Sequence, residues 1–111
     1  MSLRQKQARF AQMVARLIQQ ADALGYEVTL GDAYRDARAF GDIGQRKAYG
    51  HPKSCHKLRL AIDLNLFIDG VYRGDTASHR QLGEWWEQQG GTWGGRFGDA
   101  NHYSLEHDGM R

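Results

Sequence analysis

The sequence predicts a small α+β domain, and three features of its pattern carry that prediction. Near the N-terminus, apolar residues recur at three- and four-residue steps, which indicates an amphipathic helix. Between Leu60 and Phe67, every second residue is apolar, so that one face is entirely apolar, which indicates a strand. Asp69-Gly70 follows as a hairpin signal, so the next strand should run antiparallel. We therefore expect a small antiparallel sheet with a long N-terminal helix and a second helix.

The first helix should cover residues 3–24 and end at Gly25, because glycine terminates helices readily. Its apolar face comprises Phe10, Met13, Val14, Leu17, Ile18, Ala21 and Leu24. A strand over 26–30 should follow, and then a polar loop over 36–52 with one or two helical turns. The strand over 60–67 and a return strand from Val71 come next, followed by a helix over 77–89 that Asp75 or Thr76 begins. A glycine-rich loop over 93–98 and a last strand over 102–105 complete the chain.

Length and composition indicate one folded domain spanning residues 1–111. The 15 Lys and Arg residues exceed the 13 Asp and Glu residues only slightly and are dispersed among them, which disfavours a nucleic-acid-binding surface. No run of about 18 apolar residues is present, so stable membrane insertion is not expected. The single cysteine, Cys55, excludes an internal disulfide and a cysteine-rich zinc site, and we expect it to be a small buried thiol.

Asp63 is the first candidate functional residue, because it interrupts an otherwise largely apolar strand. A buried carboxylate costs several kcal/mol unless a cation or several donors satisfy it, so either an ion pair with an arginine or a metal would explain it. His56 lies seven residues earlier, and this odd separation would place the two side chains on opposite faces of an unbroken strand. They can converge only if His56 lies on a turn before the strand begins.

Asp99 and His102 form a second candidate pair after the glycine-rich loop, separated by three residues. Two histidines and one carboxylate, with a fourth position left to water, make a catalytic zinc site. A further carboxylate beside the metal can act as the general base of a hydrolysis. The spacing alone is only suggestive, since a chain with 5 His and 13 acidic residues offers many such sets.

The order of these residues resembles that of zinc peptidases that cut the stem peptides of peptidoglycan. This family includes D-alanyl-D-alanine carboxypeptidases, the D,D-dipeptidases of vancomycin resistance, and the L-alanyl-D-glutamate endopeptidases of phage endolysins. The family's motifs are a Tyr-Arg element, Ser-x-His-x-x-Gly-x-Ala-x-Asp, and Trp-Gly-Gly followed by Asp/Glu-x-x-His. Their counterparts here are Tyr34-Arg35, Ser54-x-His56-x6-Asp63 with Ala61 two residues before the aspartate, and Trp93-Gly94-Gly95 followed by Asp99-x-x-His102.

The resemblance implies the LAS-type metallopeptidase fold, with the zinc site at the sheet. It implies that Zn²⁺ is bound by His56, Asp63 and His102, and that Asp99 is the general base. Arg35 would stabilise the oxyanion or hold a substrate carboxylate, and Ser54 would hydrogen-bond the substrate near the metal.

Three departures from the family pattern bear on these assignments. Arg59 stands where the motif has glycine, so the turn must be built differently or its side chain must point to solvent. The serine that usually precedes Tyr-Arg is replaced by the run 31–33, which leaves Arg38 as a competitor to Arg35. Tyr103-Ser104 follows His102 in place of the usual Phe and Glu or Gln, which changes the expected substrate-facing wall.

The other histidines and the tryptophans are weaker candidates. His51 and His107 are possible alternative ligands, His107 a distant one. His79, at the start of the second helix, is expected to be a solvated surface residue. Of the adjacent Trp85 and Trp86, we expect one to enter the core and the other to reach the surface.

The resemblance implies a monomeric, endolysin-like hydrolase. It should cleave the L-alanyl-D-glutamate or the D-alanyl-D-alanine bond of the peptidoglycan stem peptide. The N-terminus lacks a secretory signal, so we expect synthesis in the host cytoplasm, release by a holin or another membrane-lesion partner, and action in the periplasm and cell wall. The alternatives are a D,D-dipeptidase and a non-catalytic, metal-stabilised module that binds the cell wall.

Overall fold

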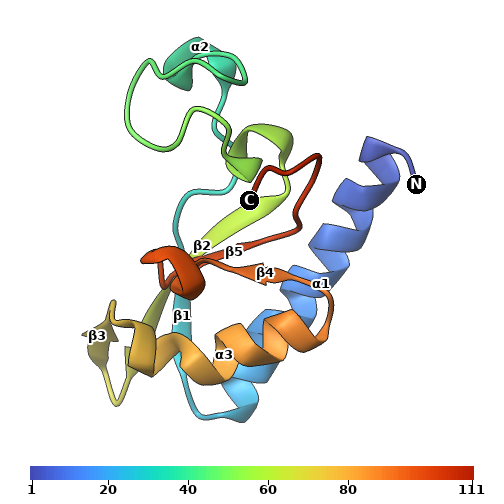
Figure 1. Ribbon diagram of the computed structural model, residues 1–111. Helices are drawn as coiled ribbons and strands as arrows, with labels where there is room; N and C mark the ends of the chain where they lie inside the picture. The colour runs from blue at the N-terminus through green and yellow to red at the C-terminus, as the bar shows by residue number, and fades with distance from the viewer.

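A small antiparallel sheet lies at the centre of the computed structural model, which describes residues 1–111 (Figure 1). Its strands are hydrogen-bonded in the order β1-β2-β5-β4, and β3 pairs with β2. The elements are α1 (Leu3–Ala23), β1 (Glu27–Leu30), α2 (Ala37–Phe40), the 3-10 helix η1 (Cys55–Leu58), β2 (Ala61–Ile68), β3 (Val71–Arg73), α3 (Thr76–Gln88), β4 (Thr92–Trp93), the 3-10 helix η2 (Gly94–Phe97) and β5 (His102–Ser104). The predicted α+β class is thus confirmed.

Local signals set the ends of the two long helices. Ser2 caps α1: its Oγ accepts a hydrogen bond from the Gln5 amide at 3.1 Å, and Gln5 Oε1 accepts one from the Ser2 amide at 2.9 Å. Asp75, rather than Thr76, caps α3, because its carboxylate accepts from the Ser78 amide at 2.8 Å. None of the helices is both long and apolar enough to cross a membrane.

Strand β2 is central, as its apolar sequence predicts. It pairs with β1 and β3 along its second half and with β5 along its first half. Alternate side chains of its inner face, together with Leu60 just before it, are buried in one cluster with side chains of α1 and α3. The resulting core comprises Phe10, Met13, Leu17, Ala21, Cys55, Leu60, Ala61, Ile62, Leu64, Leu66, Leu82, Trp86, Trp93, Tyr103 and Leu105.

Two smaller expectations about side chains are also confirmed. Trp86 is fully buried, whereas its neighbour Trp85 is half-buried at the edge of the core. Cys55 is a buried thiol whose Sγ donates to the Leu105 carbonyl oxygen at 3.3 Å. Burial raises the pKa of Cys55 to about 11, which makes it inert as a nucleophile at neutral pH.

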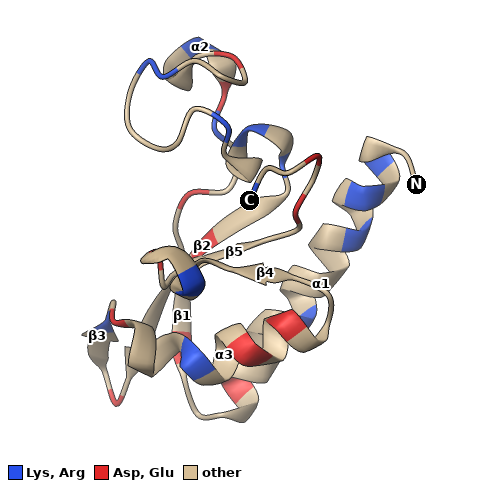
Figure 2. Cartoon of the chain, in the orientation of Figure 1, with Lys and Arg blue, Asp and Glu red and all other residues tan.

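The polar segment 36–52, between β1 and η1, forms a lobe that stands away from the sheet (Figure 1). It contains a single helical turn, α2, as expected for this loop. Lys57 of η1 holds the lobe in place, because its Nζ donates to the carbonyl oxygens of Asp42 at 3.0 Å and Phe40 at 3.3 Å. Charged residues of both signs are spread over the helices and loops around the sheet (Figure 2).

The prediction for His79 is wrong, because its side chain is completely buried. Its Nε2 lies 3.1 Å from the Arg73 carbonyl oxygen, which can only accept, so Nε2 donates. Its Nδ1, 2.8 Å from the Tyr103 hydroxyl, then accepts. The glycine-rich segment also differs from the expected loop, since it forms β4 and η2. Both differences arise from contacts with β5, which no local pattern reveals.

We expect His79 to make the protein less stable in acid. Burial lowers the pKa of His79, and the hydrogen bond to Arg73 only partly offsets this effect. As pH falls below about 6.5, the unfolded chain binds a proton that the folded one resists, so the free energy of unfolding decreases. Urea unfolding at pH 5 to 8, with a chelator present, should show a smaller acid-side decrease for His79→Asn than for the unmodified protein. Parallel pH profiles would contradict this assignment.

Candidate metal centre

The pairing of β2 with β5 brings Asp63 and His102 together. They are direct cross-strand partners in the antiparallel register, so their side chains project from the same face of the sheet. This is the outer face, because the neighbouring Ile62, Leu64 and Tyr103 point into the core. The sheet therefore places a carboxylate and an imidazole side by side without help from any loop.

A tight turn before β2 adds His56 to this pair. His56 lies on η1, which Ser54 caps: its Oγ accepts from the His56 amide at 3.2 Å. Arg59 ends η1 in the left-handed conformation, with φ 56° and ψ 35°, and reverses the chain into the strand. The exposed Arg59 side chain lies over the Tyr34 ring, 4.0 Å from its centroid. The expectation that His56 precedes the strand on a turn is confirmed, and an outward-pointing arginine fills the glycine position.

The three side chains converge on one point. His56 Nε2 lies 3.1 Å from Asp63 Oδ1, and His102 Nδ1 lies 3.3 Å from His56 Nε2 and 3.7 Å from Asp63 Oδ1. All three ligand atoms lie within 4.8 Å of one another. The imidazoles are almost completely buried, whereas the carboxylate is half-buried.

The hydrogen bonds of His56 fit a cation between these atoms. Its Nδ1 lies 2.9 Å from the Ala33 carbonyl oxygen, so Nδ1 carries the proton. In the neutral ring, Nε2 is then a lone pair that faces the Asp63 carboxylate and the second imidazole. Lone pairs at this separation repel unless a proton or a metal ion lies between them. Two imidazole nitrogens and a carboxylate oxygen are a donor set that suits Zn²⁺.

The electrostatics of Asp63 agree with a charged ligand. Burial raises the pKa of Asp63. Hydrogen bonds and charge interactions with His102 and His56, which form when the facing ring nitrogens carry a proton, outweigh burial and hold the pKa of Asp63 well below its usual range. The carboxylate therefore stays ionised despite its position. His102 is oriented by packing, because its ring lies edge-on to Phe97 with centroids 5.8 Å apart and its buried Nε2 has no hydrogen-bond partner.

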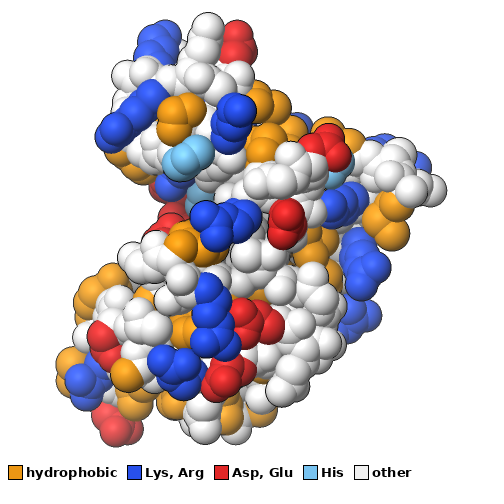
Figure 3. Space-filling view, viewed as in Figure 1, with side chains coloured by type: hydrophobic (Ala, Val, Ile, Leu, Met, Phe, Trp, Pro, Cys, Tyr) orange, Lys and Arg blue, Asp and Glu red, His pale blue; other side chains and the backbone are white.

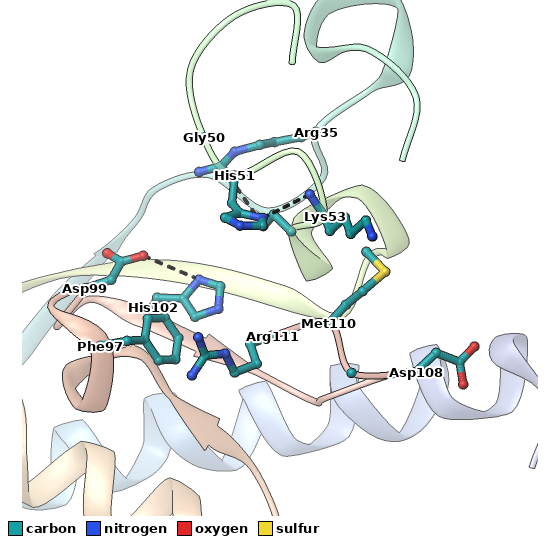
Figure 4. A pocket seen from close by; sticks show the side chains of 12 residues that line it. Arg35, Gly50, His51, Lys53, Phe97, Asp99, His102, Asp108, Met110 and Arg111 are labelled. Atoms are coloured by element: carbon teal, nitrogen blue, oxygen red, sulfur yellow. Dashed lines mark hydrogen bonds and ion pairs between the residues drawn. The ribbon is translucent and has the colours of Figure 1, made fainter. Parts of the chain in front are cut away.

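A polar cleft of about 480 Å³ opens next to these residues. Figure 3 shows histidine side chains in the hollow between the lobe around α2 and the body of the protein. Figure 4 shows that Arg35, His51 and Lys53 form one wall, whereas Phe97, Asp99, His102 and Arg111 lie on the opposite side. Ser54 also lines the cleft. A peptide could lie between these walls, beside the candidate metal ligands.

Arg35, and not Arg38, reaches the cleft. Arg35 Nε lies 3.3 Å from Asp32 Oδ2, Nη1 lies 3.5 Å from Ser54 Oγ, and Nη2 lies 3.8 Å from Asp63 Oδ2. Arg38 is paired with Asp36, and its side chain is 91% exposed. Arg38, the alternative to Arg35 in the sequence analysis, therefore lies outside the cleft.

The lobe holds the Arg35 guanidinium in position. The Tyr49 hydroxyl donates to Asp32 Oδ2 at 2.6 Å, which raises the pKa of Tyr49, and its ring lies 5.3 Å from Arg35 Cζ. Gly50, at φ 91°, approaches so closely that a Cβ there would meet the guanidinium. Sequence reasoning missed these contacts. The spacing of Asp32, three residues before Arg35, weakly indicates an ion pair between them. Tyr49 lies in an irregular loop, and no sequence pattern relates it to Arg35.

Asp99 lies at the edge of the cluster. Its Oδ2 is 3.8 Å from His102 Nδ1, and its side chain is 52% exposed. Gly94 makes this placement possible, because a Cβ on Gly94 would collide with the Asp99 carbonyl oxygen and with His102 Cβ. The Asp99 amide donates to the Gly94 carbonyl oxygen at 2.8 Å, which closes the turn. The Trp-Gly-Gly segment thus positions both Asp99 and His102.

The remaining histidine candidates lie outside the cluster. His51 lines the cleft, but its Nδ1 accepts from the Lys53 amide at 3.0 Å. His107 lies near the C-terminal turn, with Nδ1 3.4 Å from Lys6 Nζ and Nε2 3.4 Å from Asp108 Oδ2. Arg111 and Phe97 line the cleft without having been singled out from the sequence.

Comparison with known proteins identifies the family of this chain. No curated protein matches the chain. Residues 48–105, which are more than half of the chain, match the family model described as D-alanyl-D-alanine carboxypeptidase. The match contains His56, Asp63, Asp99 and His102, but it begins after Arg35. The chain therefore belongs to the D-alanyl-D-alanine carboxypeptidase family, a family of metallopeptidases that act on peptidoglycan.

Proposed function

We propose that this protein is a zinc-dependent peptidase that hydrolyses one peptide bond in the stem peptide of peptidoglycan. The observation that carries the proposal is the arrangement of His56. Its ring is fixed by the Ala33 carbonyl so that a lone pair faces Asp63 and His102, within 4.8 Å of both ligand atoms. The family match and the polar cleft beside these atoms support the same reading.

The cleft residues can carry out the proton transfers of a hydrolysis. A bound zinc ion would supply a Lewis acid that activates water and polarises the scissile carbonyl. Asp99 Oδ2 would accept a proton from the attacking water and then deliver it to the amine nitrogen as the C–N bond breaks. Its partly exposed carboxylate, 3.8 Å from His102 Nδ1, lies next to the ligands without being one of the converging three.

Arg35 would stabilise the negative charge that develops on the carbonyl oxygen, or hold a substrate carboxylate. Preorganised donors serve this purpose, because they need not reorient during the reaction. The contacts of Arg35 with Asp32, Ser54 and the Tyr49 ring hold it in one orientation. Ser54 would hydrogen-bond the substrate beside it.

We expect Arg35→Ala to lower kcat by about 10²-fold or more, the usual cost of losing an oxyanion donor. Zinc content should change little, because Arg35 is not one of the converging ligands, and the fold should remain. Arg38→Ala is the matched control, since this guanidinium is 91% exposed and outside the cleft. If Arg38→Ala alone reduced kcat, the wrong arginine would have been assigned.

Mass spectrometry of muropeptides tests the proposed function directly. The zinc-loaded protein should release products from purified peptidoglycan, and their masses will show whether the L-alanyl-D-glutamate or the D-alanyl-D-alanine bond is cut. A D,D-dipeptidase would instead trim the terminus of the stem peptide. Sedimentation with cell walls without release of any product would instead support a metal-stabilised binding module.

We also propose an endolysin-like role for the protein as a monomer, on the strength of the family resemblance. It would be made in the host cytoplasm and reach the periplasm and cell wall through a lesion made by a holin. Induction in a Gram-negative host should lyse cells only when a holin is expressed with it. Lysis at equal rates without the holin would reject the need for that partner.

A further inference from the structure

Arg111 places a second guanidinium in the cleft, on the wall opposite Arg35 (Figure 4). Its Cζ atom lies 4.2 Å from the centroid of the Phe97 ring, a stacked arrangement that orients the planar group. Phe97 in turn lies edge-on to His102. The guanidinium is thus connected by aromatic packing to a candidate metal ligand.

The backbone near Arg111 is tied to the same site. The Cys55 amide donates to the backbone oxygen of Arg111 at 3.3 Å, and Cys55 directly precedes His56. His107 and Met110 exchange two backbone hydrogen bonds, of 3.0 and 2.8 Å, which close the turn just before Arg111. The side chain therefore starts from a defined point beside the ligand segment.

The Arg111 guanidinium has no acidic side chain as an ion-pair partner within the protein. Arg35 is paired with Asp32 and lies close to Asp63, whereas Arg111 forms no ion pair with any carboxylate. Lys53 on the opposite wall is likewise unpaired. Only 2 of the 12 lining residues are hydrophobic, so the cleft suits a charged ligand better than an apolar one.

We propose that Arg111, stacked on Phe97, is a specificity residue that binds a free carboxylate of the peptide substrate. This inference rests on the proposed function and names its substrate class: acidic stem peptides whose carboxyl groups are not amidated. A guanidinium binds a carboxylate through two parallel N–H···O hydrogen bonds. A primary amide is uncharged and has an NH2 donor in place of one of the two acceptor oxygens, so it can accept only one of these hydrogen bonds and should bind more weakly.

The test uses one synthetic stem peptide in two forms, with every carboxyl group free or with every one converted to a primary amide. We would measure kcat/KM on zinc-loaded protein and the dissociation constants on zinc-loaded Asp99→Asn, which turns over slowly. For the unmodified protein, the preference is the kcat/KM of the free peptide divided by that of the amidated peptide. This ratio should fall about tenfold in Arg111→Gln, as expected for losing a charge-assisted hydrogen bond. Arg111→Lys should keep part of the preference.

Two variants control for charge alone. Arg38→Gln removes the same charge outside the cleft and should keep the full ratio, whereas Lys53→Gln removes the other unpaired cation of the cleft. The inference would be overturned if the ratio stayed unchanged in Arg111→Gln, or if only Lys53→Gln lowered it. In either case, cleavage of the peptide would still support the proposed peptidase function. Binding that depends on Arg111 without any cleavage would support the inference and reject the peptidase. If neither peptide bound, both would be wrong.

Discussion

Asp99→Asn is expected to abolish most peptidoglycan cleavage while the protein keeps its zinc and its stability. The Asp99 carboxylate is about half exposed and lies 3.8 Å from His102 Nδ1, outside the three converging ligand atoms. Its loss should therefore lower the rate of muropeptide release by roughly 10²–10⁴-fold, the usual contribution of general acid–base catalysis. The asparagine preserves the shape of the side chain and the backbone turn to Gly94.

Three measurements on one preparation separate a base from a ligand: zinc content, melting temperature and muropeptide release. Asp108→Asn is the matched control, because this exposed carboxylate lines the same cleft without reaching His102. Full activity in Asp99→Asn would reject the base assignment. Loss of zinc together with a lower melting temperature would make Asp99 a metal ligand, since metal binding and folding are coupled.

The elements that the sequence predicts well are those with a local cause. The predicted ends of helix α1 and strand β2 agree with the structure to within one residue, because the spacing of their apolar residues is visible along the chain. Asp69 and Gly70 both adopt positive φ, of 52° and 76°, as the hairpin signal requires. Arg59 shows the limit of such reasoning, because an arginine fills a left-handed position where the family motif has glycine.

The candidate metal cluster was predictable for a different reason. Asp63 is conspicuous because a carboxylate interrupts an apolar strand, and the motif order supplied His56 and His102. What the sequence lacks is the cross-strand register that places His102 opposite Asp63, which depends on pairing between segments about 40 residues apart. The roles of Arg35, Ser54 and Asp99 remain predictions, although all three line the cleft.

Long-range contacts account for what the sequence does not show. His79 is buried because Tyr103 of β5 reaches its ring, and Arg35 is fixed because Tyr49 reaches Asp32 across the lobe. Arg111 lies in the cleft with its backbone hydrogen-bonded to Cys55, more than 50 residues away in the sequence. Each contact joins residues that no periodicity or turn signal relates. The walls of the cleft are therefore less predictable than the candidate ligands beside it.

His56→Ala is expected to eliminate high-affinity zinc binding and, with it, all detectable cleavage. His56 contributes one of three converging ligand atoms, and its Nδ1 contact with Ala33 O pre-sets the direction of the other nitrogen. Alanine would remove both features. Metal analysis after dialysis should give about one zinc per unmodified chain and almost none for His56→Ala or His102→Ala, because two remaining ligands rarely retain a structural or catalytic zinc.

A thermal shift provides a readout that does not depend on activity. Zinc at about 100 times its dissociation constant stabilises a folded state by about 2.7 kcal/mol. For a chain of 111 residues this corresponds to a rise in melting temperature on the order of 10 °C. The unmodified protein and His51→Ala, which alters a cleft histidine outside the cluster, should both show this rise, whereas His56→Ala should not. Because the comparison is made within each variant, a general loss of stability in His56→Ala leaves the result interpretable. Stoichiometric zinc in both His56→Ala and His102→Ala would reject the cluster as the metal site.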